Sequence, residues 1–194
     1  MVIKKVKELI GLVFAKRQYS SMVKNINFGN PSNILDVGGS LGIFGLEVAK
    51  KLHKKISYTV IDVDKNSLRE GKEKYKEFNF EFQDAEKMTF RDKEFDLVIC
   101  KDVLHHCQNP EKAISEIKRV GEKYIIIEAR RGDKWLDDYL KGHNHFTEEK
   151  FKNLVKPEKF SFLDTLWPRF RYMVFFVLFP IIPKSKKSFM VGYS

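Results

Sequence analysis

The sequence predicts an α/β domain built on a doubly wound, mostly parallel sheet. Short apolar runs alternate with amphipathic helical segments between residues 33 and 129, and this alternation is typical of a parallel sheet with helices on both faces. The first run enters a helix through a glycine-rich turn at residues 38–42, a junction that lies at the carboxyl edge of such sheets. A chain of 194 residues, 43% of them hydrophobic and 32% charged, suits one domain with one core.

Each element is expected from its local pattern. β-branched or alternating apolar runs predict seven strands, which cover residues 33–37, 56–62, 78–83, 95–100, 121–128, 160–166 and 188–193. Apolar residues at helical spacing predict helices over residues 43–52 and 65–75. Asp64 and Thr147 are expected as N-caps, and Pro110 stands where the first turn of a helix tolerates proline.

Two segments differ from this pattern. Residues 2–15 place apolar side chains opposite a cluster of lysines, which predicts a basic amphipathic helix. Residues 167–183 form an aromatic, proline-bounded insertion whose apolar part, 173–182, is shorter than the about 20 residues that span a bilayer. Each segment either packs on its own domain or lies on an anionic membrane surface, and the insertion can also serve as a lid over an apolar substrate.

The charge and the cysteine content of the sequence limit the cellular compartments and the binding partners to be considered. With 36 basic and 26 acidic residues, the net charge is +10, which reflects solvated lysine-rich faces or favours an anionic partner such as nucleic acid or a membrane. Cys100 and Cys107 lack metal-ligand spacing and fit reduced thiols. The apolar run at residues 9–15 lacks a signal-peptide cleavage site. We expect a cytoplasmic protein without a cleaved leader, with peripheral membrane contact through 2–15 and 167–183 as an open alternative.

The spacing of the glycines in this turn distinguishes between the known sequence motifs of nucleotide-binding sites. Its glycines fit neither the dinucleotide pattern G-x-G-x-x-G nor the phosphate-binding pattern G-x-x-x-x-G-K-[ST]. Asp36, Gly38, Ser40 and Gly42 instead resemble the first motif of the class I S-adenosylmethionine-dependent methyltransferases, D/E-x-G-x-G-x-G. Ser40 stands where the middle glycine is usual.

A longer stretch carries the same resemblance. Residues 95–98, 103–106 and 109–120 match, in order, the "FDLV", "vLHH" and "dPekai.Ei.RV" blocks of small-molecule, type 11-like methyltransferases. Agreement over several blocks is more specific than one glycine turn. The resemblance implies a Rossmann-like sheet that ends in an antiparallel hairpin, in which runs 160–166 and 188–193 pair.

The resemblance also divides the single domain, residues 1–194, into three parts. Residues 1–30 form an N-terminal amphipathic helical segment, residues 31–130 a cofactor-binding core, and residues 131–194 a substrate-side region that contains the insertion 167–183. The implied cofactor is S-adenosyl-L-methionine. Asp62 ends a strand and would hold the ribose hydroxyls, and Asp84 would meet the adenine amino group. The implied cofactor-binding residues are Asp36, Gly38, Gly39, Ser40, Gly42, Asp62, Val63, Asp84, Ala85 and Lys101.

Methyl transfer requires a positioned acceptor and, for some acceptors, a base that removes a proton. Asp102, His105 and His106 follow the fourth strand and are the candidate catalytic residues, ahead of His143 and His145. No metal is expected, because adjacent histidines point apart and no carboxylate or cysteine stands at ligand spacing from them.

The expected function is methyl transfer to a small, hydrophobic or lipid-like acceptor. Two alternatives stay open, an RNA methyltransferase and a non-catalytic S-adenosylmethionine-binding module. The net charge and Arg130-Arg131, which either meet an anionic substrate or are solvated, motivate the RNA alternative. Residues 100–103 lack the Asn/Asp-Pro-Pro-aromatic tetrapeptide of base-amino methyltransferases, which makes nucleic acid the less favoured acceptor.

Overall fold

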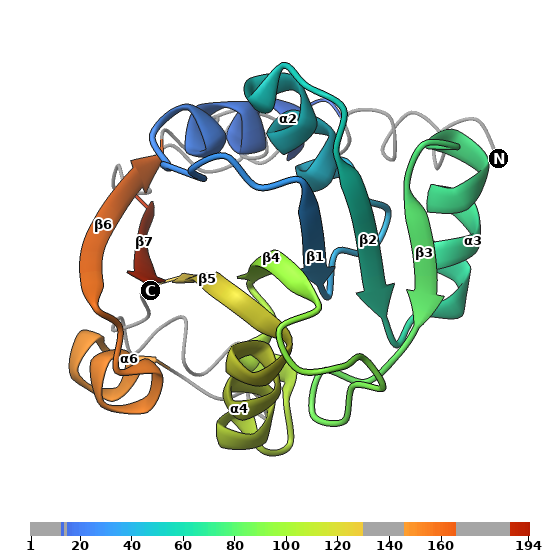
Figure 1. Ribbon diagram of the computed structural model, residues 1–194. Helices are drawn as coiled ribbons and strands as arrows, with labels where there is room; N and C mark the ends of the chain where they lie inside the picture. Colours follow the sequence, from blue (N-terminus) through green and yellow to red (C-terminus); the bar gives the residue numbers. More distant parts are fainter. Residues whose placement is uncertain (1–12, 14, 130–145, 166–186) are drawn as a thin grey trace, which may run out of the picture.

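A computed structural model describes residues 13, 15–129, 146–165 and 187–194. The strands form one seven-stranded sheet in the order β3-β2-β1-β4-β5-β7-β6 (Figure 1). The strands are β1 (Asn33–Val37), β2 (Ser57–Asp62), β3 (Asn79–Phe82), β4 (Phe95–Lys101), β5 (Gly121–Ala129), β6 (Lys159–Thr165) and β7 (Lys187–Tyr193). The helices are α2 (Ile43–Leu52), α3 (Lys65–Lys74), the short 3-10 helix η1 (Leu104–His106), α4 (Pro110–Val120) and α6 (Glu148–Val155), preceded by helical residues 15–24.

The predicted fold class is confirmed. Strands β1 to β5 are parallel where they pair, and β7 runs antiparallel to both β5 and β6. The C-terminal hairpin therefore forms as the resemblance implied. Strand β1 pairs with β2 on one side and β4 on the other, so the winding direction reverses beside β1, and ligands bind at such a switch point in open α/β sheets.

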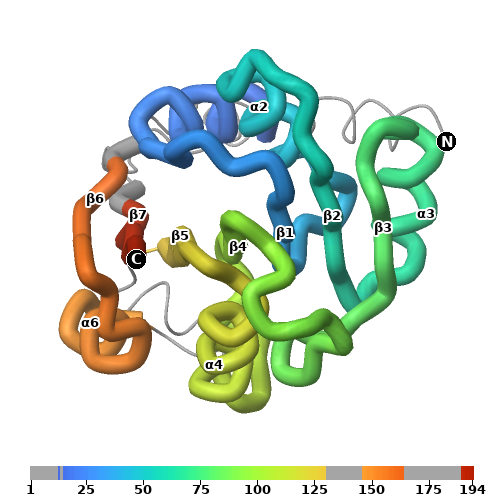
Figure 2. Tube along the Cα trace, in the orientation of Figure 1, coloured from blue at the N-terminus to red at the C-terminus, as the bar shows by residue number. Residues whose placement is uncertain are grey.

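Each face of the sheet carries its own core, because side chains alternate along each strand. In β4, for example, Leu97 and Ile99 face one core and Val98 and Cys100 the other. Helical residues 15–24 and α2 cover the first face, and α4 and α6 cover the second (Figures 1 and 2). The second core includes Val37 at the carboxyl end of β1 and Cys100 near the carboxyl end of β4, which helps to fix the position of the loops that follow these strands.

The helix ends confirm the sequence signals. The Thr147 hydroxyl accepts a hydrogen bond from the Lys150 amide at 3.2 Å, and Asp64 accepts one from the Asn66 amide at 2.9 Å. Pro110 begins α4. Helical residues 15–24 lie within the segment 1–30 that was expected to be helical, beyond the helix expected over residues 2–15. Met22, Val23 and the following apolar residues are buried in the core that α2 and the sheet share.

Other expectations concern segments that the structure does not describe. The insertion 167–183 lies outside the described residues, as does the predicted helix 2–15 apart from residues 13 and 15. Among the helices that are described, none is long and apolar enough to cross a membrane.

Candidate functional site

The glycine turn after β1 lies close against two neighbouring segments. Gly38 and Gly42 adopt left-handed backbone conformations, with φ of 67° and 76°. The amides of Gly38 and Gly39 donate to the Ile61 carbonyl of β2 at 2.8 and 3.2 Å. A Cβ atom on Gly38 would lie 2.3 Å from a methyl group of Val103, in the loop after β4. Glycine is therefore required at position 38 both by its φ angle and by this close approach.

Ser40 is also in the left-handed region, with φ of 51°. A serine in this conformation is strained relative to glycine, which is the residue usual at this position of the motif. The Ser40 amide donates to Oδ2 of Asp62 at 2.9 Å, and the Asp64 amide donates to Oδ1 of Asp62 at the same distance. An ionised carboxylate can accept about four hydrogen bonds. Asp62 thus joins the turn to β2 and retains acceptor capacity for hydroxyl groups of a ligand.

Asp36 supports the turn from within the core. It is 1% exposed, and its carboxylate accepts a hydrogen bond from the Tyr58 hydroxyl at 3.0 Å. Burial raises the pKa of Asp36 to about 7, although the Tyr58 hydrogen bond and the charge of Lys101 act in the opposite direction. A Cβ atom on Gly39 would lie 2.7 Å from this carboxyl group, so Asp36 and Gly39 are packed directly together.

A charged pair closes the other side of the turn. Nζ of Lys101 lies 2.7 Å from Oδ2 of Asp102, and the Ala129 amide donates to Oδ1 of Asp102 at 3.2 Å. Burial alone would lower the pKa of Lys101, but Asp102 and Tyr19 raise it above its usual value, and Lys101 likewise lowers the pKa of Asp102 against the effect of burial. Both side chains are therefore charged at neutral pH.

Tyr19, from the helix of residues 15–24, lines the candidate site and was not among the residues predicted for it. Lys101 Nζ lies 4.7 Å from the centre of the Tyr19 ring, within cation–π range. The Tyr19 ring also packs edge-on against Phe44 of α2, with 5.5 Å between centroids. The apolar spacing of residues 19–26 was the available signal for this helix, but nothing local identifies Tyr19 as a site residue.

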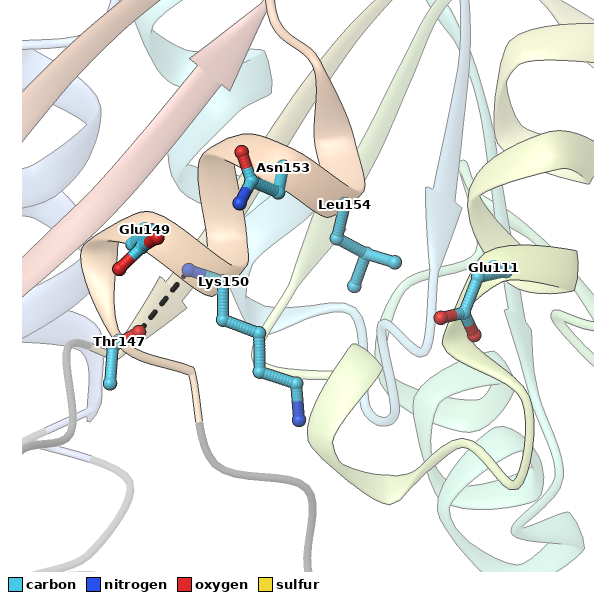
Figure 3. A pocket seen from close by; sticks show the side chains of 6 residues that line it. All are labelled: Glu111, Thr147, Glu149, Lys150, Asn153 and Leu154. Atoms are coloured by element: carbon cyan, nitrogen blue, oxygen red, sulfur yellow. Dashed lines mark hydrogen bonds between the residues drawn. The ribbon is translucent and has the colours of Figure 1, made fainter.

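Two hollows differ in how they relate to these residues. A cavity of about 110 Å³ lies against the turn and is lined by Tyr19, Asp36, Gly38, Gly39, Ser40, Leu41, Ile43, Phe44 and Lys101. A larger, open hollow of about 460 Å³ lies between α4 and α6, with Glu111 on one side and Lys150 on the other (Figure 3). Of these two, only the smaller is lined by residues predicted to bind the cofactor, and it is the candidate cofactor site because it lies at the carboxyl end of β1.

The adenine-side candidates lie on the next loops of the same edge. Val63 follows β2 and is 63% exposed. After β3, Asp84 accepts a hydrogen bond from the Glu86 amide at 2.9 Å. The Glu86 carboxylate in turn accepts from the amides of Gln108 and Asn109 at 2.7 and 3.0 Å. The loop that carries Asp84 and Ala85 is thus tied to the loop that precedes α4.

The histidines after β4 do not lie as the sequence suggested. The expectation that they point apart is wrong, because a 3-10 turn places their ring centroids 4.0 Å from each other. Glu128, near the end of β5, brings a carboxylate to His105, with 2.9 Å between Oε2 and Nδ1. Asp102, His105 and Glu128 offer ligand-type atoms within 4.8 Å of one another. Residues far apart in sequence meet here because β4 and β5 pair in parallel, and no spacing rule would reveal that.

Some predicted residues remain without a structural account. His143, His145, Arg130 and Arg131 lie outside the described residues. Among the described candidates, the structure brings the turn, Asp62 and Lys101 together at one edge, with Asp102, His105 and His106 on the adjoining loop.

The chain is similar to known methyltransferases in sequence and in fold. The chain matches the model of a methyltransferase domain family over residues 35–124. A ubiquinone/menaquinone biosynthesis C-methyltransferase of Rickettsia bellii (strain OSU 85-389) is 27% identical over 157 residues, a match that covers 74% of this chain and 62% of the relative. The chain thus spans less than two thirds of the length of this relative.

Solved structures share the fold at low identity. The [4+2]-cyclase SpnF superposes with a TM-score of 0.70 at 18% identity, covering 92% of this chain and 80% of the cyclase. A phosphoethanolamine N-methyltransferase 2 of Haemonchus contortus, solved with phosphomonomethylethanolamine and S-adenosylhomocysteine, superposes with a TM-score of 0.68 at 16% identity, covering 91% of this chain and 52% of that one. The family match runs from Leu35 in β1 to Tyr124 in β5 and includes the turn and the loop after β4, which supports a class I S-adenosylmethionine-dependent methyltransferase.

Proposed function

We propose that this chain transfers a methyl group from S-adenosylmethionine to a small, hydrophobic or lipid-like acceptor. The observation that carries the proposal is the turn after β1, whose Ser40 amide lies 2.9 Å from Asp62 and whose glycines line a cavity. A side chain at position 38 would clash with Val103, and one at position 39 would clash with Asp36. When bound, the cofactor supplies an electrophilic methyl group. The chain's own residues hold the cofactor and position the acceptor.

Each cofactor-binding residue has a role in this proposal. Asp62 accepts hydrogen bonds from the ribose hydroxyls, while Val63 packs beside the adenine ring. Asp84 and Ala85 form the adenine edge, since their loop is fixed through Glu86. Lys101 lines the cavity beside the turn, where its ammonium group is suited to an anionic part of the ligand, such as the methionine carboxylate.

The three catalytic candidates differ in their suitability as a base. Asp102 is committed to Lys101 and to the Ala129 amide, and its lowered pKa makes it a weak proton acceptor. His106 is exposed, whereas His105 is 7% exposed and bonded to Glu128. We therefore favour His105 for any acceptor whose proton must be removed, since a neutral imidazole has one nitrogen that can accept a proton and Glu128 orients the ring.

The curated relatives support the acceptor class. The Rickettsia relative is named for C-methylation in ubiquinone and menaquinone biosynthesis, and a prenylated quinol is a hydrophobic small molecule that resides in membranes. The net charge of +10 is consistent with contact with an anionic membrane surface. In this proposal, segments 2–15 and 167–183 provide that contact.

Cofactor binding is tested by calorimetry with S-adenosylhomocysteine. In Asp62→Ala, the loss of even one charge-assisted hydrogen bond, about 1.5–3 kcal/mol, should weaken binding at least about tenfold. Asp64→Ala is the matched control, because Asp64 is a neighbouring carboxylate that caps α3. No binding to the wild-type chain at millimolar ligand, or equal binding by the Asp62→Ala variant, would reject the proposal.

The acceptor is tested with two substrates in parallel. Radiolabelled methyl groups should pass to a short-chain prenylated naphthoquinol and not to tRNA. Methyl incorporation into tRNA, weakened steeply by salt as phosphate contacts require, would favour the RNA alternative instead. Binding of S-adenosylhomocysteine with no methyl incorporation into either acceptor would leave the non-catalytic binding module as the better description.

Membrane contact has its own test. Co-sedimentation with liposomes that contain anionic lipid should retain the intact chain and release a variant in which residues 173–182 are replaced by a short polar turn. If both chains stay in the supernatant while both bind S-adenosylhomocysteine, the acceptor is a soluble molecule.

A further inference from the structure

Glu128 organises the loop after β4 through three consecutive residues. Its Oε1 atom accepts hydrogen bonds from the amides of Val103 and Leu104 at 2.9 and 2.7 Å, and Oε2 lies 2.9 Å from Nδ1 of His105. Glu128 is 1% exposed. A buried carboxylate without partners is costly, whereas here one carboxylate from β5 binds the start of η1 and the first histidine of that helix together.

The loop is held in the same position by a second set of contacts. Asp102 adopts a left-handed backbone conformation, with φ of 55°, which turns the chain at the end of β4. Its amide donates to the Ile127 carbonyl at 2.8 Å, and its side chain accepts from the Ala129 amide. The residues before and after Glu128 in β5, Ile127 and Ala129, are therefore both hydrogen-bonded to Asp102. These bonds hold the start of the loop against β5 and so help to fix the distance between the Glu128 carboxylate and His105.

The charge state of Glu128 decides which nitrogen of His105 carries the proton. Burial raises the pKa of Glu128 and the charge of Asp102 acts in the same direction, while the hydrogen bonds to His105 and to the Leu104 amide offset only part of this rise. Two amide donors on one oxygen favour the ionised carboxylate. An ionised carboxylate only accepts hydrogen bonds, so Nδ1 must then be the donor, and Nε2 is left as the basic nitrogen of the neutral ring.

We propose that Glu128 is a positioning residue, which fixes His105 in the tautomer protonated at Nδ1 and so makes Nε2 the atom that takes the proton of the methyl acceptor. This inference rests on the proposed methyl transfer. The acceptor's X–H bond breaks, its electron pair stays on the acceptor atom, and the proton forms the Nε2–H bond. Glu128 then stabilises the imidazolium across the 2.9 Å contact.

The same atoms argue against a metal ion at this cluster. A cation bound by Glu128 and Asp102 would be repelled by the ammonium group of Lys101, which is bonded to Asp102, and would compete with the amides of Val103 and Leu104 for the Glu128 carboxylate. A set of acids whose oxygens accept amide and ammonium hydrogen bonds acts as a hydrogen-bonding framework.

The test measures the tautomer directly. The full chain, labelled with 15N-histidine, is examined by long-range 1H–15N correlation at pH 8, and His105→Gln identifies the His105 signals. In the wild type, Nδ1 should show a protonated-type shift and Nε2 an unprotonated-type shift. In Glu128→Gln, the amide oxygen can keep the two backbone donors while its NH2 group faces Nδ1. Nδ1 must then accept, and the proton should move to Nε2.

Glu122→Gln is the matched control, because Glu122 is exposed on the same strand, and it should leave the tautomer unchanged. A wild-type His105 protonated at Nε2 would overturn the inference by itself, even if Glu128→Gln fails to fold. So would a folded Glu128→Gln chain that keeps the wild-type tautomer. A purely structural role for Glu128 gives no reason for the proton to change nitrogen.

Calorimetry with S-adenosylhomocysteine on the same samples separates the two proposals. If the wild type binds this ligand but His105 carries its proton on Nε2, the inference fails and the proposed function stands. If the wild type does not bind it, the proposed function fails whatever the tautomer. With a prenylated naphthoquinol as acceptor, Glu128→Gln should lower kcat at least about tenfold with little change in KM.

Discussion

Replacing Asp36 by asparagine should remove a destabilising ionisation from the core. Asp36 is 1% exposed, and its pKa is raised from 3.8 to about 7. Asparagine keeps the shape of the side chain and an oxygen that can accept from the Tyr58 hydroxyl. The substitution therefore changes the charge with little change in packing.

The sign of the effect follows from proton linkage. Between about pH 4 and pH 7, the folded chain holds the Asp36 proton while the unfolded chain has released it. Stability from this group is fully present below pH 4 and is lost as the pH rises to 7. A difference of about three pKa units at about 1.4 kcal/mol each amounts to about 4 kcal/mol. Asp36→Asn should lack this loss, so its advantage over the wild type should grow by about 4 kcal/mol from pH 4 to pH 8.

The assay is urea unfolding of the wild type and Asp36→Asn at several pH values without ligand. The difference between the two curves isolates Asp36 from every other group that titrates. Asp96→Asn is a control of opposite sign, since hydrogen bonds from the amides of Ser32 and Asn33 lower the pKa of Asp96, and its contribution should be lost as the pH falls. A pH-independent difference for Asp36→Asn would refute the reasoning.

Two further predictions concern the backbone around this carboxyl group. Gly45→Ala should destabilise the chain by about 2 kcal/mol in urea unfolding, although alanine favours a helix, because the new Cβ would lie 2.4 Å from the Tyr58 ring; a gain in stability would contradict the close contact between α2 and β2. At position 40, where φ is 51°, Ser40→Val should be about 2 kcal/mol less stable than Ser40→Gly. Equal unfolding midpoints for these two variants would show that the turn does not hold the left-handed conformation.

Local patterns were sufficient for most of the fold. The order of strands and helices, the turn at residues 38–42 and the caps at Asp64 and Thr147 were predicted from neighbouring residues, and the structure confirms them. Backbone conformation and side-chain alternation are set by consecutive residues, so a strand that alternates or a turn that needs glycine is visible in the sequence. The hairpin of β6 and β7 came from the family resemblance, because pairing partners are not a local property.

What the tertiary structure alone decided is which polar groups meet. Tyr58 reaches Asp36 across paired strands, Tyr19 covers Lys101 from the helix of residues 15–24, and Glu128 reaches His105 from the next strand. Each contact depends on strand register and on the packing of helices over the sheet, quantities that no spacing along the chain encodes. The sequence by itself therefore predicted the glycine turn that we propose binds the cofactor, while the charge of Asp36 and the contact between Glu128 and His105 follow from burial and from the pairing of parallel strands.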